Sequence, residues 1–184
     1  MSCVEPAAVR PAVSREGERS CGDFDTWQRE LLFTGGFVQD GDDSEYGPKA
    51  QARFDRYVEL ADMVDGTEGP TAVKALITSL HAEDDHGAHE AVYGALERFP
   101  GRDLVRGTAM AVVNLLKIPR DNSGHVLQLL TVLASDEDLQ AFGAAFGQLH
   151  PKIRAGLAAL IAHHEADEWL ADERSIGRLR LPQD

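Results

Sequence analysis

The chain has 184 residues, and its 31 acidic residues against 18 lysines and arginines give a formal net charge of -13. This length corresponds to one domain, or to one domain plus a tail, and a hydrophobic fraction of 43% is enough to form a core. Nucleic-acid binding needs clustered cations, so the charge argues against nucleic acid and against an anionic membrane surface. It favours a basic protein partner, or a surface that is acidic only for solubility.

The sequence shows neither the pattern of a secretory signal nor that of a membrane span. No apolar segment of a secretory signal follows the start, and no apolar run approaches the roughly 18 residues of a membrane span. We therefore expect a cytoplasmic protein that does not enter a membrane. Its two cysteines, Cys3 and Cys21, lie in the polar N-terminal segment, and we expect them to stay reduced.

The chain divides into three predicted parts, an N-terminal tail, a helical repeat domain and a C-terminal tail, at residues 1–48, 49–173 and 174–184. The N-terminal tail is expected to be partly disordered, because its first residues mix Pro, Ser, Glu and Arg without periodicity. A possible short helix at 23–33 places Phe24, Trp27 and Leu31 on one side, and we expect it to dock on the end of the helical array. The last eleven residues are expected to fray.

From residue 49 onward, apolar residues recur at three- and four-residue steps, which is the period of an α-helix. Five helices are predicted near 49–64, 70–81, 85–98, 101–117 and 123–134. A sixth begins after Ser135, which forms a capping-box pattern with Asp138, and a seventh opens at His150-Pro151. No alternation typical of strands competes, so the predicted fold class is all-α.

The breaks between these helices are short, which favours antiparallel hairpins. The first, third and fifth helices start 36 and 38 residues apart, a period that fits stacked helix pairs of the HEAT or armadillo type. The later spacing is shorter, so the repeat is irregular. An α-solenoid of stacked hairpins is therefore the predicted architecture, and an irregular helical bundle is the alternative.

The stretch 81–99, HAEDDHGAHEAVYGALERF, joins an acidic, His-bearing turn to a helix. His86 and His89 lie three residues apart and share a helical face with Glu90 nearby, which is half of a possible metal site. No HExxH motif and no His-Asp dipeptide completes it. A metal-dependent enzyme that uses these three residues is one alternative, and histidines that cap helices or lie on the surface are the other.

No other catalytic pattern is present. The sequence has no GxSxG elbow, no phosphate-binding loop and no dinucleotide fingerprint, and both cysteines lie in the predicted tail. We therefore predict no enzyme, no catalytic residue, no resident metal and no cofactor.

Three acidic clusters fall at predicted helix boundaries: 83–85, 136–138 and 165–173. The helix dipole favours acids at helix N-termini, which explains part of this pattern. Their recurrence could also align them along one edge, where Trp169 would be a typical interface residue, although it could instead pack over the final helix. The candidate contact residues are Glu83, Asp84, Asp85, His86, His89, Glu90, Asp136, Glu137, Asp138, Asp167, Glu168 and Trp169.

The order of these segments resembles the immunity-protein-30-like family of bacterial polymorphic toxin systems over about residues 50–164. The matching features are an acidic turn, the pair His89-Glu90, an apolar helix that ends in Phe99 before a Pro-Gly turn, and then the segments VRGTAMAVVNLLKIP, HVLQLLTVLAS and DEDLQAFGAAF. Near the fifth helix the family pattern has a Trp, whereas this chain has Ser123-Gly124-His125.

The resemblance implies an all-helical, HEAT-like protein that protects a cell from a cognate toxin. Together with the acidic charge, it predicts an immunity protein that binds a basic toxin directly through an acidic surface. A general helical-repeat adaptor, unrelated to toxins, is the alternative.

Overall fold

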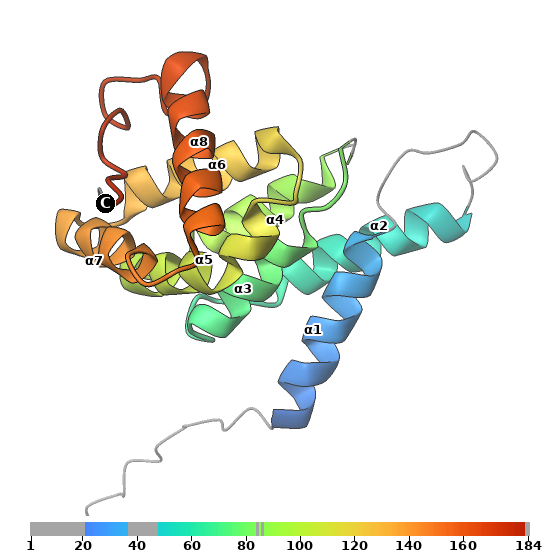
Figure 1. The fold of residues 1–184 in the computed structure, drawn as a ribbon. Helices are drawn as coiled ribbons and strands as arrows, with labels where there is room; N and C mark the ends of the chain where they lie inside the picture. The colour runs from blue at the N-terminus through green and yellow to red at the C-terminus, as the bar shows by residue number, and fades with distance from the viewer. Residues whose placement is uncertain (1–20, 37–47, 84, 86, 183–184) are drawn as a thin grey trace, which may run out of the picture.

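The computed structural model describes residues 21–36, 48–83, 85 and 87–182. These residues form eight α-helices and no strand, which confirms the predicted all-α fold (Figure 1). The helices are α1 Cys21–Gly35, α2 Pro48–Asp62, α3 Pro70–Ser79, α4 Ala88–Leu96, α5 Gly101–Leu115, α6 Arg120–Leu133, α7 Asp136–Phe146 and α8 Pro151–Asp167. Most of the predicted tail and the loop after α1 lie outside the described residues, as does Cys3.

Several helix starts follow directly from local sequence. Pro70 and Pro151 occupy the first turn of α3 and α8, where a missing N–H removes no helical hydrogen bond. The hydroxyl of Ser135 accepts a 3.2 Å hydrogen bond from the backbone N–H of Asp138 and so caps α7. The second half of the predicted capping box differs, because the Asp138 carboxylate accepts from the Ser135 hydroxyl at 2.7 Å.

Two helix starts differ from the prediction. Helix α4 begins at Ala88 instead of 85, because Gly87 has the left-handed φ of 88° and belongs to the turn. Helix α6 begins at Arg120, three residues earlier than predicted. The segment Asn122-Ser-Gly124 resembled a break in sequence, but it forms the buried first turn of this helix.

Helix α3 lies between α1 and α5, and α5 contacts α7. Among the even-numbered helices, α2 contacts α4 and α6 contacts α8. One contiguous cluster of buried apolar side chains draws on all eight helices. Gly107 of α5 packs so closely on α3 that an added Cβ would lie 2.3 Å from the Cβ of Val73. The contact between α3 and α5 is therefore especially close.

This arrangement is a compact packing of helices in which the ends differ from the middle. Helices α1 and α8 stand at steep angles to the helices between them (Figure 1). Helix α1 is held to α2 through a 2.9 Å hydrogen bond from the Trp27 indole to the carbonyl of Leu60. A regular HEAT or armadillo repeat stays a prediction, and so does the alternative of an irregular bundle.

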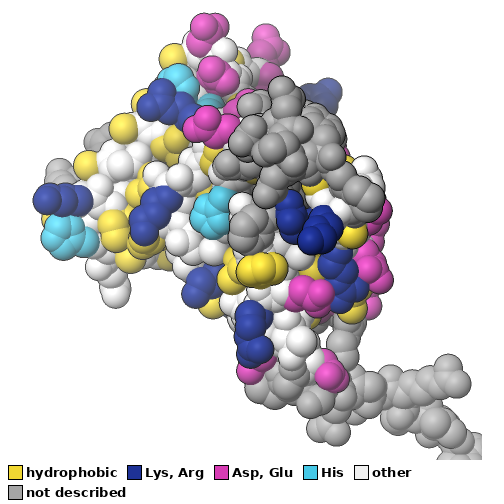
Figure 2. All heavy atoms as spheres, turned by 90° about the vertical axis from the view of Figure 1, so that its right-hand side faces the viewer, with side chains coloured by type: hydrophobic (Ala, Val, Ile, Leu, Met, Phe, Trp, Pro, Cys, Tyr) yellow, Lys and Arg dark blue, Asp and Glu magenta, His cyan; other side chains and the backbone are white. Residues whose placement is uncertain are grey.

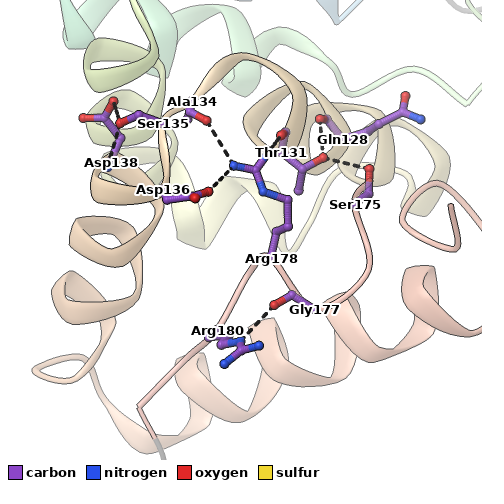
Figure 3. Close-up of polar contacts among 10 residues, drawn as sticks. All are labelled: Gln128, Thr131, Ala134, Ser135, Asp136, Asp138, Ser175, Gly177, Arg178 and Arg180. Atoms are coloured by element: carbon purple, nitrogen blue, oxygen red, sulfur yellow. Dashed lines mark hydrogen bonds and ion pairs between the residues drawn. The ribbon is translucent and has the colours of Figure 1, made fainter. Parts of the chain in front are cut away.

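The prediction that the last eleven residues fray is wrong for residues 174–182. This segment returns to the C-terminal end of α6, where Ser175 and Leu179 are buried (Figure 3). The Arg178 guanidinium donates to the carbonyl of Thr131 and pairs with Asp136. The segment is held by a few separate side-chain contacts, such as that of Arg178, and not by a repeating apolar face, so its sequence has no periodicity. Arg178 uses a carbonyl that the end of a helix leaves without a partner.

Candidate functional site

The loop before α4 is tied to the helix by Asp85. Its carboxylate accepts a 2.5 Å hydrogen bond from the backbone N–H of His89, within the first turn of α4. An acid at this place also interacts favourably with the helix dipole. Glu83 of the same loop is exposed, while Asp84 and His86 lie outside the described residues. Helix capping therefore explains the position of Asp85 without a partner protein.

His89 lies in the core, although we predicted it as a contact residue. Its side chain is enclosed between the rings of Tyr57 and Tyr93, whose centroids lie 6.2 Å and 6.4 Å from its own. The Nδ1 atom is 3.5 Å from a carboxylate oxygen of Asp85, and neither ring nitrogen has a hydrogen-bond partner. Burial lowers the pKa of His89, against the opposing charge of Asp85, so the ring is neutral at neutral pH. A partner protein cannot reach this ring directly.

The two described members of the possible metal site, His89 and Glu90, do not point to one place. His89 points into the core, whereas Glu90, the next residue on α4, is exposed, since neighbours on a helix diverge by about 100°. His86, the third member, lies outside the described residues. Across the described residues, no group of three or more His, Cys, Asp or Glu side chains could hold a metal ion.

The same loop is joined to the start of α6 through Asn122. The Asn122 amide donates to the backbone carbonyls of Leu80 and Ala82 at 3.2 Å and 3.0 Å. Its oxygen accepts from the Tyr93 hydroxyl at 3.1 Å. These bonds satisfy a buried polar group and place the acidic loop beside the first turn of α6, which also carries Asp121.

A stack of three rings connects α4, α6 and the turn after α8. His125 lies between Tyr93 and Trp169, with ring centroids 3.8 Å and 4.5 Å away. The Trp169 indole donates a 2.7 Å hydrogen bond to the Asp121 carboxylate. Gly124 makes this possible, since an added Cβ would lie 2.3 Å from the Trp169 ring and 2.5 Å from the His164 ring. A Trp therefore lies against the start of the fifth predicted helix, but it comes from the far end of the chain.

Carboxylates surround this stack. Burial lowers the pKa of His125, whereas the charges of Glu90 and Asp121 act in the opposite direction. Burial raises the pKa of Tyr93, and the charges of Asp85 and Asp121 raise it further. Asp121 is hydrogen-bonded to Trp169, Asp85 to the first turn of α4, and Glu90 lies one turn before Tyr93 on the same helix. We call the surface formed by Asp85, Glu90, Asp121, His125 and Trp169 the acidic end.

The second predicted acidic cluster lies elsewhere, at the opposite end of α6. Asp136 pairs with Arg178, Asp138 faces the cap residue Ser135, and Glu137 is exposed (Figure 3). The 14 residues of α6 separate this cluster from the acidic end by roughly 20 Å at the helical rise. The three clusters therefore do not share one edge.

The third predicted cluster is divided. Asp167 and Glu168 are exposed where α8 ends, beside Trp169, and Figure 2 shows acidic side chains gathered at this end of the molecule. Glu168 lies 3.9 Å from His163. Glu165 instead accepts from the backbone N–H of Gly177 and so holds the C-terminal segment. Only the part around Trp169 adjoins the acidic end.

Sequence reasoning missed Asp121 and His125, which complete this site. Pro119 was the signal that could have found them, because its geometry at the N-cap position starts α6 at Arg120 and puts Asp121 into the first turn. The stacking of His125 had no signal in the sequence, because its partners lie 32 residues before and 44 residues after it.

No helix in the described part of the chain combines the length and the apolar character that a membrane crossing needs. No protein-family model matches the chain, and neither a curated protein nor a solved structure matches it.

Proposed function

We propose that this chain is an immunity protein that binds a cognate bacterial toxin directly, with the acidic end as its contact surface. The observation that carries the proposal is the position of Trp169. Its ring is stacked on His125, fixed by Asp121 and partly exposed among carboxylates. A rigid aromatic side chain in such a setting is typical of the residues that contribute most to protein interfaces.

Helix capping explains Asp85 and the first-turn position of Asp121, but it does not explain the indole that is hydrogen-bonded to Asp121. Trp169 belongs to neither helix start, and it comes from the turn that follows α8. A lysine or arginine of a basic toxin could lie over the indole while it pairs with the neighbouring carboxylates. Several acids at one end of the molecule would also attract such a partner before contact.

The proposal is tested by co-expression with the toxin gene that neighbours this one. We expect rescue of growth and co-purification of the two proteins. The double variant Glu90→Lys, Asp121→Lys should weaken binding by about tenfold or more, with most of the loss in the association rate and with strong dependence on salt. Failure of the natural protein both to rescue growth and to co-purify would overturn the proposal.

The matched control is Glu137→Lys. This acid is equally part of a predicted cluster and is exposed, but it lies beyond the other end of α6. Its reversal should change affinity by less than about twofold, since at a Debye length near 8 Å a charge so distant is screened. Equal losses in the control and in the acidic-end variant would show a general charge effect instead of a contact surface.

A further inference from the structure

The outward side of α5 differs from the acidic character of the molecule. Its exposed side chains are Arg102, Arg106, Met110 and Val113, and together with Lys117 in the turn that follows the helix we call them the α5 stripe. Steps of three and four residues keep them within an arc of about 80° on the helix. The two apolar members, Met110 and Val113, are 49% and 45% exposed. The stripe therefore contains three cations, two apolar side chains and no acid.

The cations of the stripe form no close ion pair with a described residue, whereas arginines elsewhere do. Arg56 pairs with Glu30 at 2.8 Å, and Arg98 pairs with Asp62 at 3.0 Å. Figure 2 shows basic and acidic side chains intermixed on one face of the molecule. Arg106 and Lys117 form no side-chain hydrogen bond or ion pair with a described residue, and Arg102 has only Asp103 at 3.9 Å.

An apolar groove adjoins the C-terminal end of the stripe. It has a volume of about 320 Å³ and lies between the end of α5 and helix α8, with Leu116, Gly156 and Leu160 in its walls. Leu116 follows Val113 by three residues, so the groove continues the apolar part of the stripe. An added Cβ at Gly156 would lie 3.2 Å from Leu116, so a larger residue there would narrow the groove. Arg120 stands at its rim and adds a further cation.

We propose that the α5 stripe and this groove form a docking surface for an acidic amphipathic helix of a partner protein. Arg106 on α5 and Lys117 in the turn after it are 11 residues apart in sequence, which corresponds to about 16 Å, or three turns, at the helical rise. The apolar side chains between them suit the apolar face of such a helix, and the groove suits one larger apolar side chain. Carboxylates beside that face would meet the unpaired cations.

The apolar content distinguishes this partner from a nucleic acid. Phosphates would use the cations, but they would leave Met110, Val113 and the groove exposed to water. The groove end of this surface adjoins the acidic end, since Arg120 precedes Asp121 and His163 of the groove wall lies 3.9 Å from Glu168, whereas Arg102 and Arg106 lie towards the other end of α5. The net charge of -13 does not prevent this contact, because screening at physiological salt limits each charge to about 8 Å.

The test uses the full chain and three labelled probes in fluorescence anisotropy at about 0.15 M salt. The first probe is an acidic peptide of about 18 residues with leucines at helical spacing. The second has the same composition in shuffled order, and the third is an oligothymidylate of similar charge. We expect the first peptide to bind at least about tenfold more tightly than either of the others.

Two variants and a control complete the test. Arg106→Glu with Lys117→Glu, and separately Met110→Gln with Val113→Thr, should each weaken binding of the first peptide by about tenfold, and both alter exposed side chains only. Lys49→Glu, which reverses an exposed cation on α2, away from the groove, should change it by less than about twofold. Equal binding of the shuffled peptide or the oligothymidylate, no binding at millimolar peptide, or equal effects of variants and control would overturn the proposal.

Discussion

At the scale of single residues, glycines decide how closely the helices approach. Gly124 and Gly94 both lie inside helices, where a glycine costs about 1 kcal/mol relative to alanine. At Gly124 the missing side chain is what admits Trp169 and His164 to the surface of α6. At Gly94 nothing lies within 4 Å of the position of a Cβ. The two positions therefore have opposite requirements, although they look alike in sequence.

Gly124→Ala should lower the free energy of unfolding by about 1 to 3 kcal/mol, because the new methyl group overlaps the Trp169 and His164 rings. Gly94→Ala should instead raise it by up to about 1 kcal/mol, because it improves helix propensity without a clash. Urea denaturation of the two variants measures both changes. If Gly124→Ala were as stable as Gly94→Ala, the described packing of Trp169 would be wrong.

At the scale of elements, the C-terminal segment completes the end of α6. The last carbonyls of a helix lack partners within it, and Arg178 supplies donors to those of Thr131 and Ala134. The Thr131 hydroxyl also donates a buried hydrogen bond to the Ser175 hydroxyl at 3.0 Å. A segment without helical periodicity is thus held by contacts that no local pattern encodes.

Arg178→Ala should release this segment and lower the free energy of unfolding by about 1 to 2 kcal/mol, since charge-assisted hydrogen bonds at a partly exposed site are lost. Hydrogen exchange should then accelerate at the amides of residues 175–178, and the helices of the first half should stay unchanged. Arg180→Ala is the control, because that side chain is exposed and reaches only the carbonyl of Gly177. Similar exchange in both variants would contradict the anchoring role of Arg178.

At the scale of the whole molecule, buried histidines link stability to pH. Burial lowers the pKa of His89, of His125 and of His164. The unfolded chain titrates them near the ordinary value of about 6.5, so below that pH it binds more protons than the folded protein does. Stability is therefore highest above this pH and is lost as the pH falls through it.

The free energy of unfolding should consequently decrease between about pH 7.5 and pH 5.5, with a slope that approaches 1.4 kcal/mol per pH unit for each histidine that stays neutral in the folded state. Denaturation curves at several pH values measure this slope. Glu30 and Asp172 have lowered pKa values, so the stability that they contribute is lost only at more acidic pH, as the pH falls below the usual carboxyl range. A flat profile over this range would show that the three rings are not kept neutral by the fold.

The sequence by itself determined the elements of this protein. The period of the apolar residues along the chain predicted helices at the positions of α2 to α8, and proline and serine marked several of their starts, because these signals act over one or two turns. It also identified Trp169 and the acids of 83–85 as candidate contact residues, since residue type and charge are local properties. Asp85 and the position of Trp169 at the end of α8 both belong to the site that the structure contains.

Only the tertiary structure decided which of these residues meet. Asn122 joins the 81–87 loop to α6 across about 40 residues, and Trp169 reaches Asp121 across 48. The same packing encloses His89 in the core and separates the cluster at 136–138 from the acidic end. Such contacts depend on the packing of helices that are distant along the chain, and helical periodicity carries no information about that packing beyond which face is buried.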